Sequence, residues 1–330
     1  MEFSGFFKPY PANRPLTEDE RQRQLHQKQR LEVESVYQLS VIRFNTTYME
    51  VVDKWFAWRG VLTSVAAMMF ALVVFGVGMW PYLYSTQDQV ADGFWWVALA
   101  VSIVALIPLS LSVWAFKTDA FRFTHFPIRL NRKTRMVHVF RTNGTVLSVP
   151  WSEVFFCIAA LPQRNWEIQG HVLDKDGVTV KETFAFMLWG AGERDRDELP
   201  RYWEFVRRYM EEGPASVAEI VEYCLPIADQ RESFTFGFHR THGDAGSAPL
   251  PIQLFILLIY LVTYPGRWIA MRTSKLPVWP QKIEEACAVD ANDPYRKIAL
   301  TNKPITDHAP IYFVVVVGVA LLVAWVGLLR

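Results

Sequence analysis

The sequence predicts an α+β membrane protein in which a pair of apolar helices precedes a β-rich block that is closed by one helix. Three observations predict this fold class. Residues 60–84 and 94–116 contain no charged side chain, and each run is long enough to cross a bilayer. From about residue 121 onward, short apolar runs alternate with turn residues. Residues 199–210 then carry apolar side chains at helical spacing.

Composition excludes several classes of protein. Among 330 residues, 51% are hydrophobic and the formal net charge is +1, so no overall field favours nucleic acid as a partner. Cys157, Cys224 and Cys287 are odd in number and widely separated. No metal-binding spacing such as C-x-x-C occurs, and we interpret the three as reduced thiols of a protein that faces the cytosol.

Residues 1–59 are predicted to form a cytosolic N-terminal helical arm. No secretory signal peptide is visible, because the first long apolar run begins only near residue 60. Thr17 followed by Glu20 matches a capping box, in which a threonine hydroxyl and a glutamate side chain cap the same helix start. The spacing predicts a polar helix over residues 18–37.

Residues 60–116 are predicted to form a transmembrane helical hairpin. The connecting loop contains Asp88 and Asp92 and no lysine or arginine. Both flanks are basic: Arg43, Lys54 and Arg59 come before, and Lys117, Arg122, Arg129, Arg132, Lys133 and Arg135 come after. By the positive-inside rule, both flanks lie in the cytoplasm and the acidic loop lies outside.

Residues 117–213 are predicted to form a cytosolic domain of meandering strands that ends in a helix. Thr142-Asn143-Gly144 predicts a tight hairpin turn. The helix is expected over residues 198–212. The expected strands cover residues 122–130, 136–140, 145–149, 154–160, 166–173 and 178–188.

The C-terminal part is expected to return to the membrane. Residues 214–250 are predicted to form a linker with a short helix at 216–225, and residues 272–310 a basic loop. Residues 251–271 form a short membrane or interfacial helix, and both alternatives remain open because the run is short and is followed by basic residues. Residues 311–329 predict a final transmembrane helix. The chain therefore crosses three or four times, and the side of the C-terminus depends on residues 251–271.

No pattern indicates catalysis, a cofactor or a metal. His239 and His242 are metal-ligand types, but a site needs further ligands, and a solvated loop explains the pair. Cys157 lies in an apolar run, which favours a buried and inert thiol. The transmembrane runs contain no ionisable residue, which disfavours transport. We therefore expect a protein that is not an enzyme.

Arg129, Arg132, Lys133 and Arg135 are the candidate membrane or partner contact residues. They lie in the first predicted hairpin after the transmembrane pair. Such a cluster would attract anionic lipid headgroups or contact a partner protein. The alternative interpretation is that these residues only set the orientation of the helices.

Several strands followed by one helix resemble bacterial pleckstrin-homology-like (PH-like) domains that are fused to paired membrane helices. The whole chain also resembles an uncharacterised family of bacterial multi-pass inner-membrane proteins. The motifs that carry this resemblance are Asn131-Arg132-Lys133, Val149-Pro150-Trp151, Glu153-Val154-Phe155-Phe156, Gly170-His171-Val172-Leu173 and Arg267-Trp268-Ile269-Ala270-Met271-Arg272.

Similar proteins occur near type VI secretion effector genes. The resemblance implies an immunity or accessory protein of the inner membrane that binds an effector or a secretion component, in addition to the lipid bilayer. A lipid-binding scaffold of the PH-like kind is the alternative.

Overall fold

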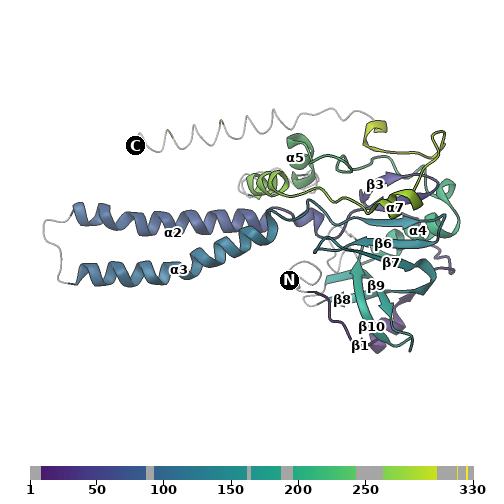
Figure 1. Cartoon of the computed structure of the whole chain (residues 1–330), viewed down its shortest axis with the longest axis horizontal. Helices are drawn as coiled ribbons and strands as arrows, with labels where there is room; N and C mark the ends of the chain where they lie inside the picture. The colour runs from purple at the N-terminus through teal and green to yellow at the C-terminus, as the bar shows by residue number, and fades with distance from the viewer. Residues whose placement is uncertain are drawn as a thin grey trace. The chain divides into compact units, whose positions relative to one another are not determined.

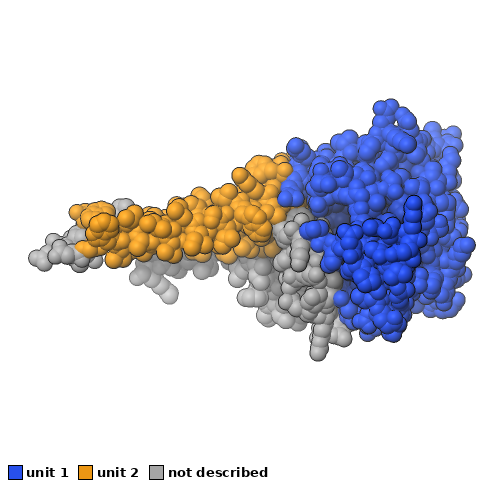
Figure 2. Space-filling view, turned by 60° about the horizontal axis from the view of Figure 1, so that its bottom comes forward, with its two compact units in different colours: residues 1–58, 122–231, 274–303 blue, residues 59–121, 232–273, 304–330 orange. Residues whose placement is uncertain are grey.

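A computed structural model describes residues 9–86, 93–161, 165–186, 196–242 and 263–302, together with Gly318 and Trp325. The chain divides into two compact units, which Figure 2 colours separately. Unit 1 comprises residues 1–58, 122–231 and 274–303. Unit 2 comprises residues 59–121, 232–273 and 304–330.

Unit 1 is built on two antiparallel sheets of five strands each, so the α+β class is confirmed (Figure 1). The first sheet has the order β3 (Val41–Phe44), β4 (Tyr48–Val51), β5 (Ile128–Asn131), β6 (Met136–Phe140) and β7 (Val146–Pro150). The second has the order β1 (Arg14–Pro15), β10 (Thr179–Ala185), β9 (Asn165–Leu173), β8 (Val154–Leu161) and β2 (Gln24–Leu25). The described strands form two separate sheets and not one closed barrel.

The predicted strands after residue 135 are confirmed, because their signals are local. Gly144 takes the left-handed conformation that the turn requires, at φ +85°, and the Asn143 side chain accepts a hydrogen bond from the backbone N–H of Thr145. The first strand of the block begins at Ile128 and not at residue 122.

The prediction of a helical N-terminal arm was wrong. Among its described residues, 9–59, the one α-helix is α1 (Glu18–Gln22), whose capping box at Thr17 and Glu20 is confirmed, and a 3₁₀ turn, η1 (Phe56–Trp58), lies near the end. The rest of the segment supplies β1 to β4. The β3–β4 turn is closed by Asn45, whose side-chain oxygen accepts from the backbone N–H groups of Thr47 and Tyr48.

The apolar helices are inserted between two neighbouring strands. β4 and β5 pair directly, with Val51 opposite Ile128 and Tyr48 opposite Asn131. All of residues 59–121, including both long helices, lie between these strands in the sequence. The first sheet therefore depends on a strand pair whose members are far apart along the chain.

Helix α4 (Glu198–Glu211) completes the core of unit 1, as the sequence predicts. Its face of Leu199, Trp203, Val206 and Met210 is buried in a cluster that contains side chains of both sheets. Trp203 stacks on Trp151 with ring centroids 5.7 Å apart. The helix therefore provides the apolar surface on which the two sheets share one core.

The segment after residue 213 differs from its prediction. A 3₁₀ turn, η5 (Pro214–Ser216), replaces the helix expected at 216–225. The backbone N–H of Leu225 instead donates to the carbonyl of Val41, so this stretch is used by β3. Pro226 disfavours a helical conformation at Leu225, which is consistent with this outcome.

The predicted basic loop at 272–310 is in large part a folded section of unit 1. It contains α7 (Gln281–Ala286) and η7 (Ala299–Thr301). Phe44 and Lys297 exchange two backbone hydrogen bonds, of 3.0 and 2.7 Å, which cover the outer edge of β3. The Lys297 ammonium donates to the carbonyls of Ala218 and Val221, so this cation is used inside the fold.

Unit 2 contains the two long helices that the sequence predicts, α2 (Val61–Ser85) and α3 (Phe94–Asp119). Both are long and apolar enough to cross a membrane. Aromatic rings meet where α2 ends and α3 begins, with the centroids of Trp80 and Phe94 5.5 Å apart and those of Tyr84 and Trp95 4.9 Å apart.

The start of α2 is tied to the end of α3 by Asp119. One carboxylate oxygen of Asp119 accepts from the backbone N–H groups of Gly60 and Thr63 and from the Thr63 hydroxyl, at 2.9 to 3.1 Å. The other lies 3.0 Å from a guanidinium nitrogen of Arg59. Both ionic side chains are almost wholly buried. Asp119 is therefore an N-cap supplied by a different helix.

A further helical stretch of unit 2, residues 263–273, packs against the start of α2. A Cβ on Gly266 would lie 1.9 Å from the Ser64 hydroxyl, so only glycine permits this contact. Arg267 in the same stretch is buried and forms a two-bonded ion pair with Glu232, at 2.7 and 2.8 Å. Residues 251–262 and nearly all of 311–329 lie outside the described residues, so their membrane crossings stay predictions.

Candidate functional site

Arg129 does not belong to a contact surface. It is fully buried, and its guanidinium binds Glu50 through Nε at 3.0 Å and Nη2 at 2.8 Å. The rings of Tyr48 and Trp279 lie 4.5 and 4.6 Å from the guanidinium carbon. The prediction of Arg129 as a membrane or partner contact residue was wrong, because the hairpin carries this side chain into the core and not to solvent.

The remaining basic residues of the β5–β6 turn are only partly available. Arg132 is half-buried, whereas Lys133 is exposed. Arg135 is 43% exposed, but its guanidinium bonds to the Met210 carbonyl and to the Glu211 carboxylate. Within the described residues, Lys133 is therefore the one member of the predicted set whose side chain is both exposed and without a hydrogen bond, although its backbone N–H bonds to the Thr47 carbonyl.

The buried pair of Arg129 and Glu50 holds the C-terminal section against the first sheet. Arg129 also contacts Glu284 of α7 at 3.2 Å, and Trp279 precedes that helix. Burial alone would lower the pKa of Arg129. The combined attraction of Glu50, Tyr48 and Glu284 is larger than this effect, so the pKa of Arg129 is raised. Arg129 stays charged, and the role of the cluster is to fasten α7 to β4 and β5.

His138, on the neighbouring strand β6, gives the fold an expected dependence on pH. Burial, with the nearby Arg129 charge, lowers its pKa to about 4. The unfolded chain, with a pKa near 6.5, therefore binds a proton that the folded protein rejects. We expect the free energy of unfolding to fall by about 1–2 kcal/mol between pH 7 and pH 5 from this group.

Thermal unfolding of the detergent-solubilised chain at pH 7 and at pH 5 measures this loss of stability. In His138→Gln, the same comparison is expected to show a smaller loss, since glutamine can keep the hydrogen bond to Ser148, which is 2.8 Å long in the native protein. An equal loss in the variant would contradict the assignment to His138.

A second buried cluster contains Cys157, His171, Glu20 and Arg14. The Cys157 sulfur lies 3.4 Å from Nε2 of His171, and the same nitrogen is 3.4 Å from the Glu20 carboxylate. A thiol beside a histidine is the usual arrangement of a cysteine nucleophile. Here burial raises the pKa of Cys157 to about 12, and the thiol has no exposed surface. The prediction that this thiol is buried is confirmed, and its inertness stays a prediction.

The His239–His242 stretch differs from the predicted loop in its backbone. Helix α5 (Phe234–His242) includes both histidines, and their side chains lie outside what the structure describes. Within the described residues, no group of three or more His, Cys, Asp and Glu side chains is arranged to hold a metal ion. The three cysteines are free and buried.

A pocket of about 370 Å³ lies beside β6 and β10, but its charges are used internally. Arg141 and Glu182 form two hydrogen bonds of 2.6 Å across it. Lys54 pairs with Glu167 and lies 4.8 Å from the centre of the Trp55 ring. These contacts favour a structural role.

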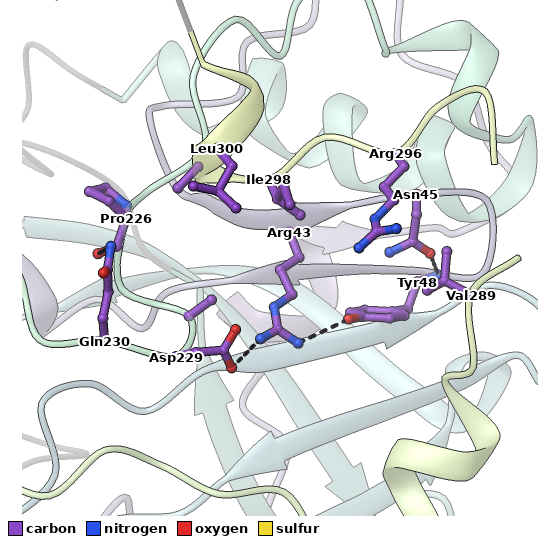
Figure 3. Close-up of a pocket in the computed structure, with 12 residues that line it drawn as sticks. Arg43, Asn45, Tyr48, Pro226, Asp229, Gln230, Val289, Arg296, Ile298 and Leu300 are labelled. Atoms are coloured by element: carbon purple, nitrogen blue, oxygen red, sulfur yellow. Dashed lines mark hydrogen bonds and ion pairs between the residues drawn. The ribbon is translucent and has the colours of Figure 1, made fainter. Parts of the chain in front are cut away.

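A larger pocket, of about 470 Å³, is the best candidate for a binding site in unit 1 (Figure 3). It is lined by residues of three distant segments: β3 and the β3–β4 turn, residues 226–230, and residues 289–300. Arg43 enters from β3, where its guanidinium bonds to Asp229 and lies 3.4 Å from the Tyr48 hydroxyl. Arg296 and the exposed Leu300 line it from the C-terminal section. No local sequence pattern could reveal this site, because its parts are adjacent only after folding.

Fold and site together define an α+β protein with an inserted pair of apolar helices and an arginine-containing pocket that also has apolar lining. The chain belongs to DUF6708, a family of unknown function whose model matches residues 104–291, more than half of the sequence. The match runs from α3 to just beyond α7 and includes residues 226–230 of the pocket, whereas β3, the β3–β4 turn and residues 296–300 lie outside it. No curated protein and no solved structure matches the chain.

Proposed function

We propose that this chain is a non-enzymatic protein of the bacterial inner membrane that acts by binding another protein through unit 1. The observation that carries the membrane part is the exposure of apolar side chains on α2 and α3. Leu72, Phe75 and Ile107 are 66%, 68% and 62% exposed. A helix of a soluble core would bury such side chains, whereas lipid covers them in a membrane.

The orientation follows from charge. Basic residues flank the helical pair, and Asp88 and Asp92 are the charged residues of the connecting loop. The N-terminus and unit 1 then lie in the cytoplasm, by the positive-inside rule. Pairing of Arg59 with Asp119 in the folded protein does not alter this argument, because the rule concerns the cationic residues that flank the helices.

Binding is favoured over catalysis by the chemistry of the charged groups. The ionic side chains of the core pair with one another, as in Arg129–Glu50 and Arg267–Glu232. The pocket of Figure 3 presents guanidinium groups, which recognise anions but stay protonated and are poor proton-transfer groups near neutral pH. The guanidinium groups of the pocket therefore support a binding role.

The resemblance to inner-membrane proteins found near type VI secretion effector genes supports a more specific proposal. The partner is then an effector or a secretion component, and the protein is an immunity or accessory protein. Strands β4 to β10 followed by α4 have the order of a PH-like domain, and we propose that relationship for unit 1. Co-expression with a neighbouring effector gene tests the immunity role, since absence of protection would exclude it.

A lipid-binding scaffold is the second candidate, and exposed Lys133 is the observation that favours it. A single free cation contributes on the order of 1 kcal/mol at an anionic surface. Because Arg129 is buried and Arg135 is hydrogen-bonded, the basic surface is smaller than the sequence suggests. Protein binding remains the first proposal.

Membrane anchoring and orientation are tested together on the full chain. We expect the protein to resist alkaline carbonate extraction and to dissolve in detergent. Two variants, each with one added cysteine, then report the two sides of the membrane. One is Thr86→Cys, after α2, and the other is Lys175→Cys, between β9 and β10. In intact spheroplasts, a membrane-impermeant thiol reagent should label only the first.

The native cysteines are buried, so the unsubstituted chain is the control for background labelling. After lysis, the reagent should label both variants, which shows that Lys175→Cys is accessible once the membrane is open. Extraction by carbonate would contradict membrane anchoring. Labelling of Lys175→Cys in intact spheroplasts would contradict the orientation.

A further inference from the structure

The pocket of Figure 3 already contains one carboxylate, which the chain itself supplies. Arg43 extends from β3 and binds the side chain of Asp229. The Arg43 side chain is 20% exposed, whereas that of Asp229 is 85% exposed. The cation therefore belongs to the framework of the sheet, and the anion lies on the surface.

Solvent weakens the contact between Arg43 and Asp229 on the side of the exposed Asp229 carboxylate. Exposed ion pairs contribute little to stability, because water solvates both ions and the side chains lose freedom when they pair. The hydrogen bond joins one oxygen of Asp229 to one nitrogen of Arg43. A carboxylate that bonds the guanidinium through two parallel hydrogen bonds would interact more strongly. A ligand carboxylate that forms two such bonds can therefore replace the carboxylate of Asp229 on Arg43.

A second guanidinium makes the pocket electropositive. Its charged lining residues are two cations, Arg43 and Arg296, and one anion, Asp229, and the carboxylate of Asp293, outside the lining, also interacts with Arg296. Arg296 is exposed, and its side chain makes no hydrogen bond or ion pair within the described residues. An incoming anion would therefore meet two guanidinium groups and one carboxylate in the lining.

Apolar side chains lie next to these charges. Leu300 is 92% exposed, and Ile298, Val289 and Pro226 line the same pocket. An exposed leucine beside a guanidinium suits a ligand that carries an apolar side chain next to its carboxylate. A free inorganic anion would leave this apolar surface in water, so the combination favours a segment of protein.

We propose that this pocket binds a carboxylate-bearing, partly apolar segment of a partner protein, whose carboxylate replaces that of Asp229 on Arg43. The inference rests on the proposed binding function and specifies the chemistry of the partner. Arg43 provides the principal charge, Arg296 the second, and Leu300 the apolar contact. Asp229 acts as an internal competitor that lowers the affinity of the free protein for its ligand.

The test uses the full chain purified in detergent and two fluorescent peptides, identical except that a central aspartate between leucines is asparagine in the second. We expect the aspartate peptide to bind more tightly in fluorescence anisotropy. Asp229→Asn should tighten this binding about two- to fivefold, since an exposed competing pair is removed. Arg43→Met should weaken it about 10- to 100-fold, the loss expected for hydrogen bonds to a charged group.

The chain offers a matched control in Arg201 and Glu34, an ion pair of 3.1 Å elsewhere on unit 1. Its side chains are 31% and 86% exposed, close to the values for Arg43 and Asp229. Glu34→Gln and Arg201→Met should leave the affinity for either peptide unchanged. Circular dichroism of each variant confirms that unit 1 is folded.

Several results would overturn the proposal. One is the absence of saturable binding of the aspartate peptide to Asp229→Asn. Others are equal affinities for the two peptides, or equal effects of Glu34→Gln and Asp229→Asn. Binding of anionic phosphatidylglycerol nanodiscs that depends on Arg43, without peptide binding, would assign the pocket to lipid instead. These results differ from a failure of the proposed membrane anchoring, in which alkaline carbonate would extract the protein from the membrane.

Discussion

Replacing Arg129 by methionine is expected to lower the free energy of unfolding by about 3–5 kcal/mol. The substitution leaves the Glu50 carboxylate, which is 4% exposed, without the guanidinium that forms two hydrogen bonds with it. It also removes the cation between the rings of Tyr48 and Trp279. Thermal and denaturant unfolding of the solubilised chain measure the loss.

The double variant Glu50→Gln with Arg129→Met is the informative control. Once the partner carboxylate is neutral, methionine no longer leaves a buried charge behind, so the double variant should be more stable than Arg129→Met alone. Glu284→Gln removes only the contact of Arg129 with a carboxylate that is 47% exposed, and should cost less than about 1 kcal/mol. A double variant as unstable as the single one would contradict the assigned ion pair.

Replacing Asp119 by alanine is expected to cost about 3–5 kcal/mol, and the start of α2 should open first. The change removes the acceptor of three hydrogen bonds from Gly60 and Thr63, and the carboxylate that lies 3.0 Å from Arg59. Limited proteolysis near residue 60 and hydrogen exchange of the first turn of α2 measure the local effect.

Two milder substitutions separate charge from hydrogen bonding at Asp119. Asp119→Asn keeps an oxygen acceptor and loses the charge, so it should fall between alanine and the native protein. Thr63→Val removes one hydrogen bond, from the hydroxyl, and should cost about 1 kcal/mol. If Asp119→Ala did not increase cleavage near residue 60, the carboxylate would not be the cap of α2.

The sequence allowed prediction of those elements whose signals are local. The turn at Gly144, the face of α4 around Trp203, and the two apolar runs each depend on neighbouring residues, and all were confirmed. The strands of the N-terminal segment were missed because their pairing partners lie far away in the sequence. β4 pairs with β5 across the inserted helices, and β1 and β2 are only two residues long.

The candidate site was less accessible to sequence reasoning than the fold. The basic residues near position 130 form a visible cluster, but burial of Arg129 depends on Glu50 and Glu284, which come from other segments. The pocket has the same difficulty, since Arg43 and Arg296 become neighbours only when residues 289–300 fold onto β3. Single-sequence patterns report spacing along a helix or strand, and not which distant charges will meet.

The interruption of the first sheet affects how the protein is made. β4 leaves the ribosome before the apolar helices, but its partner β5 follows them, and Phe44 pairs with Lys297 near the end of unit 1. At typical rates of synthesis, the ribosome needs roughly 10 to 50 s to pass from Phe44 to Lys297. The helices are thus exposed, and must be sheltered from water, while the β3–β4 hairpin is still unpaired on both sides. In the proposed membrane role, delivery to the bilayer therefore comes before completion of unit 1, and delayed delivery would leave strand edges and apolar helices open to aggregation together.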